Sequence, residues 1–218
     1  MTSPVFPTKW DFLTSTVLFG VDATTEALLL GSENGADPVW VCWTDRALAE
    51  HQLPPGYTLR QARASRILPL LPEGTAVRID PRRPWGMAFD GAALAGLVPL
   101  CVPFPAGCPA DLGALDVPAD LKAALRAVVR ERAFVNRIWF FRFRIEDGPA
   151  QGCVAVEGPE GPEAWETALH AVTGALDRTF AGSDLDRAFA GVHVLDVAGL
   201  PAEVQDWVVE QRAVASSA

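Results

Sequence analysis

The sequence has few residues of the kinds that carry recognisable chemistry. It contains three histidines and four cysteines, and no two histidines share a local motif. The closest cysteines, Cys101 and Cys108, have six residues between them and no histidine nearby, whereas structural zinc sites use shorter cysteine spacings and a second pair. The chain also lacks the Gly-rich nucleotide-binding motifs and the Gly-x-Ser-x-Gly elbow. We therefore expect no metal, no cofactor and no assignable catalytic residues, which favours a protein that is not an enzyme.

Long apolar runs and an excess of basic residues are also missing. No run approaches the roughly 20 apolar residues that cross a bilayer, and residues 1–9 are unlike a signal peptide. The net charge of −9 disfavours nucleic acid and anionic membranes as partners, because both attract cationic surfaces. We expect a cytoplasmic protein with reduced cysteines. The preference for Arg over Lys, with abundant Ala, Gly and Pro, is typical of a GC-rich bacterial genome.

Proline divides the chain. Five prolines fall between residues 98 and 118, where they remove backbone donors and oppose both helix and central strand. This composition predicts a Pro-rich linker at 99–117 between two small domains, at 1–98 and 118–218.

The first half is predicted to be a mixed domain. Three short apolar runs suggest an antiparallel meander, at 16–21, 27–30 and 39–43, with a polar turn at 31–38. Thr44 is the expected N-cap of the next helix, and Asp90 of a later one. Further elements are expected as a helix at 65–71, a strand at 75–80 and a helix at 91–97.

The second half has clearer periodicity. Leu121, Leu125, Val128 and Val129 predict one face of a helix, and residues 139–145 alternate as a strand does. The remaining elements are expected as a strand at 152–157, a helix from 162 to about 182, a strand at 191–197 and a helix at 201–212. Together the halves predict an α/β protein of the α+β type: two small domains with mostly antiparallel strands and helices packed on one face.

Two segments are candidates for binding. Arg82, Arg83 and Trp85 lie on a proline-stiffened loop after a predicted strand, and these residue types are enriched where proteins bind partners or planar anions. The alternative is a rigid surface loop whose Trp85 packs on the core.

The second candidate is the strand-to-helix corner of Trp43, Thr44 and Asp45. A helix start exposes backbone N–H groups that can bind an anion. An ordinary N-cap at Thr44 would explain the same residues without any ligand.

These segments carry a resemblance to the SseB family, named for enhanced serine sensitivity. Residues 39–48 (VWVCWTDRAL) resemble the strand, polar corner and helix of its N-terminal domain, and residues 76–81 (AVRIDP) resemble a later strand that ends in Asn-Pro. Residues 118–129 and 135–145 are similar to the first helix and strand of its C-terminal domain. The resemblance implies a two-domain, cytoplasmic bacterial protein of uncharacterised activity, and it supplies no catalytic residues.

Three hypotheses follow. The first is a non-enzymatic binding or adaptor protein that acts through protein contacts or a small anionic metabolite at residues 82–85. The second is a thiol-dependent enzyme of serine or sulfur metabolism with Cys42 or Cys101 as nucleophile, which would need a lowered thiol pKa. The third is a structural module that forms a homodimer through an exposed sheet edge.

Overall fold

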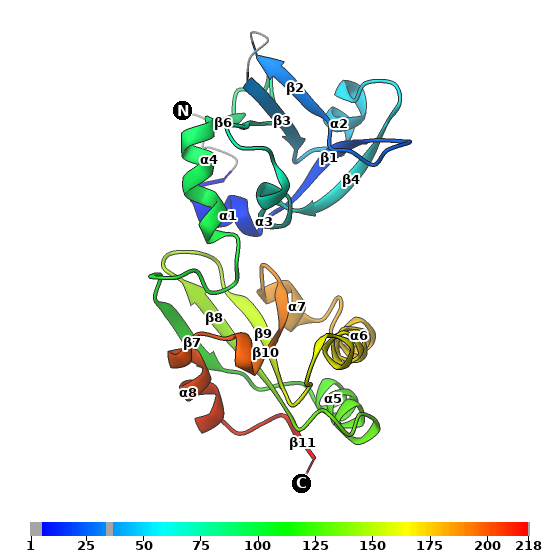
Figure 1. Ribbon diagram of the computed structural model, residues 1–218, viewed down its shortest axis with the longest axis vertical. Helices are drawn as coiled ribbons and strands as arrows, with labels where there is room; N and C mark the ends of the chain where they lie inside the picture. The colour runs from blue at the N-terminus through cyan, green and yellow to red at the C-terminus, as the bar shows by residue number, and fades with distance from the viewer. Residues whose placement is uncertain (1–5, 34–36, 218) are drawn as a thin grey trace. The chain divides into compact units, whose positions relative to one another are not determined.

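A computed structural model describes residues 6–33 and 37–217, and the chain folds as two compact units, Met1–Gly107 and Cys108–Ala218. Each unit combines a mixed, mostly antiparallel sheet with helices (Figure 1). The protein therefore has the α+β fold expected from the sequence. The division between the units follows Gly107. The expected linker contains a strand, β7 (Ala110–Ala114), which pairs with the sheet of the second unit.

The first unit is built on a sheet in the order β4-β1-β3-β5-β6, with β2 also paired to β3. Its strands are β1 (Thr16–Asp22), β2 (Leu30–Glu33), β3 (Asp37–Trp43), β4 (Tyr57–Arg63), β5 (Ala76–Ile79) and β6 (Met87–Phe89). Its helices are α1 (Lys9–Thr14), α2 (Arg46–Gln52), α3 (Ala64–Ile67) and α4 (Gly91–Leu97), with 3-10 turns η1 (Leu68–Leu70) and η2 (Val98–Leu100).

The first three strands do not form the simple meander that the sequence suggested. β3 pairs with β2 along its first part and then with β1 at its end, where Leu18 lies opposite Trp43. The difference arises because β1 extends to Asp22 and β2 begins only at Leu30, so both strands fit along one edge of β3. Residues 34–36 of the expected turn lie outside the described residues.

Both faces of this sheet are apolar and carry helices. Trp40 and Cys42 of β3 point to one face, and Val41 and Trp43 to the other, because side chains alternate along a strand. All four are buried or half-buried. α2 covers the face of Trp43, whereas α4 packs on β5 and β6.

The second unit has a sheet in the order β10-β9-β8-β11, with β7 also paired to β8. The strands are β7, β8 (Arg137–Ile145), β9 (Gln151–Glu157), β10 (Val192–Asp196) and β11 (Ala215–Ser216). The helices are α5 (Ala119–Glu131), α6 (Pro162–Thr179), α7 (Asp184–Ala188) and α8 (Ala202–Glu210), with a 3-10 turn η3 (Val197–Gly199). The four residues of the predicted apolar helix face are all buried on α5, as expected.

β8 is buried on both faces, which explains the placement of the helices. Ile138 and Phe140 belong to a core formed with α5 and α6. Trp139 and Phe141 point to the opposite face, where the Phe141 ring lies 5.4 Å from that of Trp207 on α8. The prediction of helices on one face is therefore corrected in both units, because strands with two apolar faces need cover on each side.

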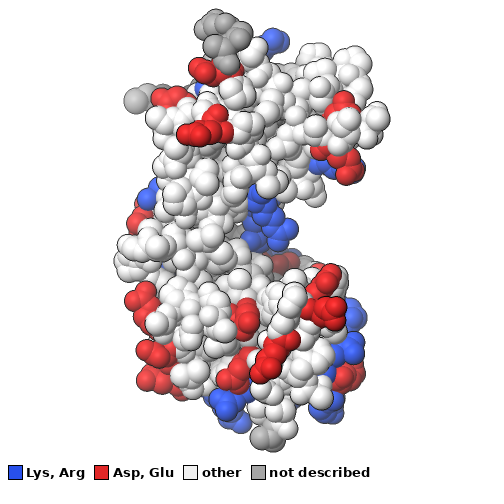
Figure 2. Space-filling model, in the orientation of Figure 1, with Lys and Arg blue, Asp and Glu red and all other residues white. Residues whose placement is uncertain are grey.

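No described helix has both the length and the apolar character needed to cross a bilayer. On the face of the molecule seen in Figure 2, acidic and basic side chains are dispersed among a majority of uncharged residues.

Candidate functional site

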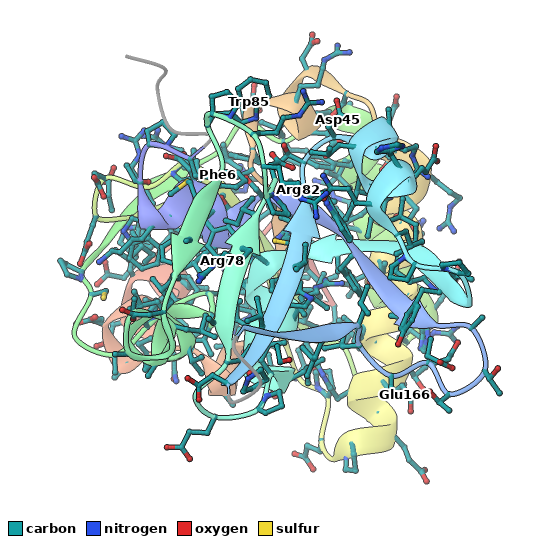
Figure 3. The ribbon with its side chains drawn as sticks, turned by 90° about the horizontal axis from the view of Figure 1, so that it is seen from above. Phe6, Asp45, Arg78, Arg82, Trp85 and Glu166 are labelled. Carbon is teal, nitrogen blue, oxygen red and sulfur yellow. The ribbon has the colours of Figure 1, made fainter. Side chains whose placement is uncertain are left out.

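The two predicted binding segments meet at one edge of the first sheet. β3 and β5 are parallel neighbours, with Val39 opposite Ala76 and Cys42 opposite Ile79. Their carboxyl ends therefore reach the same edge, and the segments that follow them begin side by side. Asp45, Arg82 and Trp85 lie at this end of the sheet, whereas Arg78 lies further back along β5 (Figure 3). Such edges are the usual place for ligands in sheets with parallel strands.

Asp80 joins the two segments. Its carboxylate accepts hydrogen bonds from the Thr44 N–H, at 2.8 Å, and from the Thr44 hydroxyl. The Asp80 N–H donates to the Cys42 carbonyl at 3.0 Å. Asp80 is fully buried, with no exposed side-chain surface. A buried carboxylate needs such partners, so this contact fixes the position of the loop relative to the corner.

Thr44 is not the N-cap of α2, which corrects the sequence-based prediction. Asp45 is the cap, and its side chain accepts a hydrogen bond of 2.7 Å from the Leu48 N–H. The reason is that the Thr44 side chain is already engaged by Asp80. Thr44 and Asp45 therefore have structural roles at this corner.

The loop after β5 is tightly folded. Asp80 and Arg82 both have positive φ angles, of 46° and 71°, and the N–H groups of Arg83 and Gly86 close successive turns at 3.1 and 3.0 Å. A Cβ atom on Gly86 would lie 2.7 Å from the Asp80 carbonyl oxygen, so the turn requires glycine at this position. Non-glycine residues with positive φ are strained and are often found at ligand-binding sites.

A groove of about 550 Å³ lies beside this edge. Its floor is largely apolar and includes Leu29, Val39, Val41 and Trp43. Its other lining residues come from β2, from α2 and the segment that follows it, and from β5 and the loop that follows it: Gly31, Ser32, His51, Gln52, Pro54, Arg78, Pro81 and Arg82. The groove therefore combines an apolar floor with two arginines and a histidine.

Gln52 holds the walls of the groove together. Its Oε1 accepts a hydrogen bond of 3.0 Å from Trp43 Nε1, and its Nε2 donates to the Pro81 carbonyl at 3.4 Å. One side chain thus connects the end of β3, α2 and the loop that carries Arg82. These two hydrogen bonds hold α2 in place relative to the loop.

The predicted site residues divide into three groups. Trp43 and Arg82 line the groove, and Thr44 and Asp45 support its edge. Arg83 and Trp85 are not among the lining residues. The Arg83 guanidinium lies 5.3 Å from the centre of the Trp85 ring, and Trp85 is 38% exposed, so Trp85 does not pack on the core.

Sequence reasoning missed three polar residues of the groove that carry hydrogen-bonding or charged groups on long side chains, namely His51, Gln52 and Arg78. His51 and Gln52 lie in the last turn of α2 and Arg78 lies in the middle of β5. Neither His51 nor Gln52 belongs to a motif, and Arg78 lies within residues 76–81 at a position that the motif does not single out. Only the 3.6-residue period of the helix and the alternation of the strand could have placed them on the same face as Trp43.

The cysteines do not have the environment of nucleophiles. All four are free. Burial, reinforced by the charge of Asp80, raises the pKa of the Cys42 thiol far above its usual range. Burial raises the pKa of Cys101 to about 11. A reactive cysteine needs the opposite shift, so the geometry does not support thiol chemistry at either residue.

The remaining histidines have structural contacts. His193 Nε2 lies 2.8 Å from Gln151 Oε1, and the Nδ1 atom of His170 lies 3.0 Å from the Glu166 carbonyl. Across residues 6–33 and 37–217, no three His, Cys, Asp or Glu side chains are grouped to hold a metal ion.

Neither a protein-family model nor a curated protein sequence matches this chain. The resemblance to the SseB family therefore depends on the motifs at residues 39–48 and 76–81 and on the order of elements in the second unit.

Proposed function

We propose that this chain is a non-enzymatic binding protein of the SseB type, from the bacterial cytoplasm, whose first unit binds a small organic anion in the groove beside Arg82. The observation that carries the proposal is the combination of a basic rim and an apolar floor in one preformed groove. The SseB resemblance supports a link to serine sensitivity, and it is the reason to include serine and cysteine among the ligands tested.

The charges of the groove support an anionic ligand. The chain has a net charge of −9, and its overall field repels anions. Within the described residues no carboxylate forms an ion pair with Arg82. An exposed arginine on a strained loop is thus available to a carboxylate or phosphate, for which its planar donor group is well suited. Val39 and Val41 would contact the apolar part of such a ligand.

Isothermal calorimetry with isovalerate, and with its neutral amide isovaleramide, tests this proposal. Isovalerate joins a carboxylate to a branched apolar group, and L-serine and L-cysteine are added because of the family resemblance. We expect isovalerate to bind more tightly than its amide, and Arg82→Glu to weaken binding by about tenfold or more. Equal binding of acid and amide would contradict the proposal.

Arg83→Glu provides a matched control. It makes the same change of charge one residue away, on a side chain that does not line the groove. We expect this variant to bind nearly as the wild type does. If both variants lose affinity equally, the effect is one of general charge and the groove is not the site.

A protein partner is the second candidate, favoured by the exposed pair of Arg83 and Trp85. Tryptophan and arginine dominate many interface hot spots. Affinity capture from the host lysate should then lose a specific partner with Trp85→Ala and retain it with Arg82→Glu. If both variants still capture the partner, this loop is not the docking surface.

A further inference from the structure

The second unit has an opening in the edge of its sheet. β7 ends at Ala114, opposite Phe141, and the pairing of β11 begins with Ala215 opposite Ile138. β7 and β11 thus lie along the same edge of β8, one beyond the other. Trp139 and Phe140 lie between them, where neither strand provides a partner.

The backbone of Phe140 faces this opening. The Ile138 carbonyl accepts a hydrogen bond of 2.8 Å from the Val214 N–H, so the backbone groups of Ile138 point toward β11. The direction alternates along a strand, which turns the N–H and C=O of Phe140 to the same edge two residues later. The N–H of Phe140 therefore faces the opening, beyond the ends of β7 and β11.

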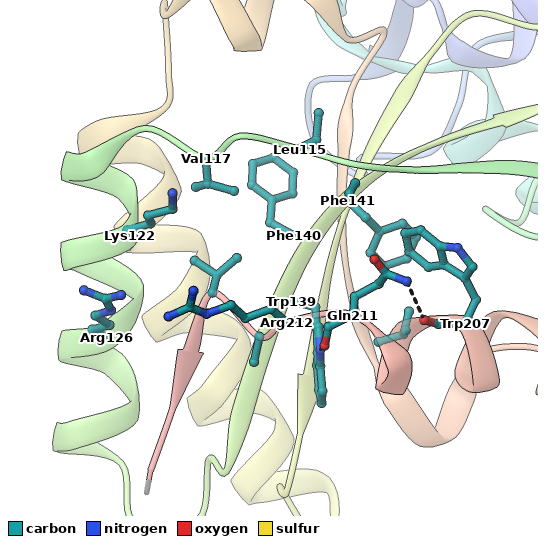
Figure 4. A pocket seen from close by; sticks show the side chains of 14 residues that line it. Leu115, Val117, Lys122, Arg126, Trp139, Phe140, Phe141, Trp207, Gln211 and Arg212 are labelled. Carbon is teal, nitrogen blue, oxygen red and sulfur yellow. Dashed lines mark hydrogen bonds between the residues drawn. The ribbon is translucent and has the colours of Figure 1, made fainter.

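A pocket of about 420 Å³ lies at the opening (Figure 4). Lys122 and Arg126 extend from α5 on one side, and Trp207 and Gln211 lie on the other (Figure 4). Trp139 is fixed there, because its Nε1 donates to the Gln211 carbonyl at 3.1 Å. The pocket therefore extends from α5 to α8 through the gap between β7 and β11. Its walls include aromatic rings of β8 and α8.

The basic residues of this region form one continuous set. Lys122, Arg126 and Arg130 are spaced four residues apart on α5 and so lie along one side of the helix. A neighbouring cavity of about 600 Å³ is lined by Arg126, Arg130 and Arg212, and the first pocket also contains Arg126 and Arg212. The two cavities therefore share two arginines.

Among the described residues, most of these cations have no carboxylate partner. Lys122 is paired with the exposed Asp116 at 3.3 Å. In the described part of the chain, no ion pair involves Arg126, Arg130 or Arg212. Like charges at this spacing slightly destabilise a helix. Their concentration beside an aromatic pocket, in a chain of net charge −9, is therefore better explained by a ligand than by folding.

We propose that the second unit binds a small anion that carries an aromatic or branched apolar group. Arg126 and Arg212 hold the anionic group, and the apolar group contacts Val117, Phe141 and Trp207. The Phe140 N–H is available to a further oxygen of the ligand. The anionic group is a carboxylate or a phosphate ester, both of which pair with arginine. This site is separate from the groove of the first unit, and each proposal can fail without affecting the other.

The indole N–H signals of the tryptophans provide a test by NMR. Phenylacetate, phenyl phosphate and the neutral phenylacetamide are titrated separately into the full-length protein, with signals assigned by Trp139→Phe and Trp207→Phe. We expect an anionic probe to shift the signals of Trp139 and Trp207. A shift of the Trp43 signal, assigned by Trp43→Phe, would report separate binding in the groove of the first unit and does not count toward this site. If phenylacetate binds more tightly than phenyl phosphate, the anionic group of the ligand is a carboxylate. If phenyl phosphate binds more tightly, it is a phosphate ester. Phenylacetamide that binds as tightly as both anions would overturn the proposal.

Charge reversal locates the site. The double variant Arg126→Glu, Arg212→Glu should weaken binding of the anionic probe by about tenfold or more. Arg132→Glu is the control, because Arg132 follows α5 and lines neither cavity. Unchanged signals of the other tryptophans verify that the variants are folded. Equal loss in the control, or retained binding in the double variant, would refute the assignment.

Discussion

The Asp80 carboxylate holds Thr44 through two hydrogen bonds, one from the backbone N–H and one from the hydroxyl, across 36 positions of the sequence. This contact joins the ends of two parallel strands and sets the edge from which Arg82 reaches the groove. It is also the physical basis of the two short motifs at residues 39–48 and 76–81, whose polar residues meet here.

Asp80→Ala should lower the free energy of unfolding by about 3 kcal/mol, because two hydrogen bonds to a buried carboxylate are lost. Urea denaturation measures the change. Asp45→Ala, which removes only the helix cap, should cost about 1 kcal/mol. In a double-mutant cycle, Thr44→Val and Asp80→Ala should be non-additive, since both remove the hydrogen bond between the Thr44 hydroxyl and the Asp80 carboxylate. Additive effects would show that the contact contributes little.

Gly86→Ala should destabilise the first unit by about 2 kcal/mol, because the added Cβ would lie 2.7 Å from the backbone oxygen of Asp80. Gly96→Ala on α4 is the matched control. Beyond its chain neighbours and the backbone of its own helix, no described atom lies within 4 Å of the place that the added methyl group would take. Alanine also favours helix over glycine by about 1 kcal/mol. Thermal unfolding should therefore move in opposite directions for the two variants. A shift of the same sign would contradict the steric argument.

Trp43→Phe should cost about 1 kcal/mol more than Trp40→Phe in urea denaturation, because only Trp43→Phe removes a hydrogen bond. Both tryptophans are buried in β3, and both variants lose similar packing. Trp43 also donates to Gln52, whereas Trp40 Nε1 is a buried donor without a partner among the described residues. If the two variants lose equal free energy of unfolding, the hydrogen bond from Trp43 to Gln52 contributes nothing to stability.

Apolar periodicity predicted the elements whose own side chains form the core. α5 is an example, since Leu121 and Leu125 recur with the period of a helix and are buried as expected. β4 was not predicted, although it pairs with β1 along its whole length. Its residues are all exposed or half-buried, without regular alternation, and include two arginines. Its pairing with the neighbouring strand defines it, because it has no apolar pattern of its own.

The candidate site was predicted only in part for a related reason. Arg82 and Trp43 were recognised because they stand in unusual local sequences. His51 and Gln52 have no local signal, and their role depends on how α2 lies across the sheet. The same holds for Thr44, whose side chain could cap α2 or bind Asp80 with equal local plausibility. The parallel pairing of β3 with β5 decides between these alternatives, and no short segment encodes it.

The thiols should be poor nucleophiles in the folded protein. At pH 8 we expect iodoacetamide to alkylate Cys101 roughly a hundredfold more slowly than a small reference thiol, because a pKa of about 11 instead of 9.0 reduces the thiolate fraction by that factor. Cys42 and Cys153 are buried and should react only after unfolding in urea. Mass spectrometry of the alkylated peptides resolves each site.

The raised pKa of Cys101 also makes the stability of the folded protein depend on pH. The fold favours the neutral thiol of Cys101, so the unfolded chain loses this proton at a lower pH than the folded protein does. Stability should therefore fall as the pH rises from about 9 to about 11, more steeply in the wild type than in Cys101→Ala. Rapid alkylation of Cys101 or Cys42 in the folded protein near pH 7 would contradict this account, and it would return the thiol-dependent enzyme to consideration.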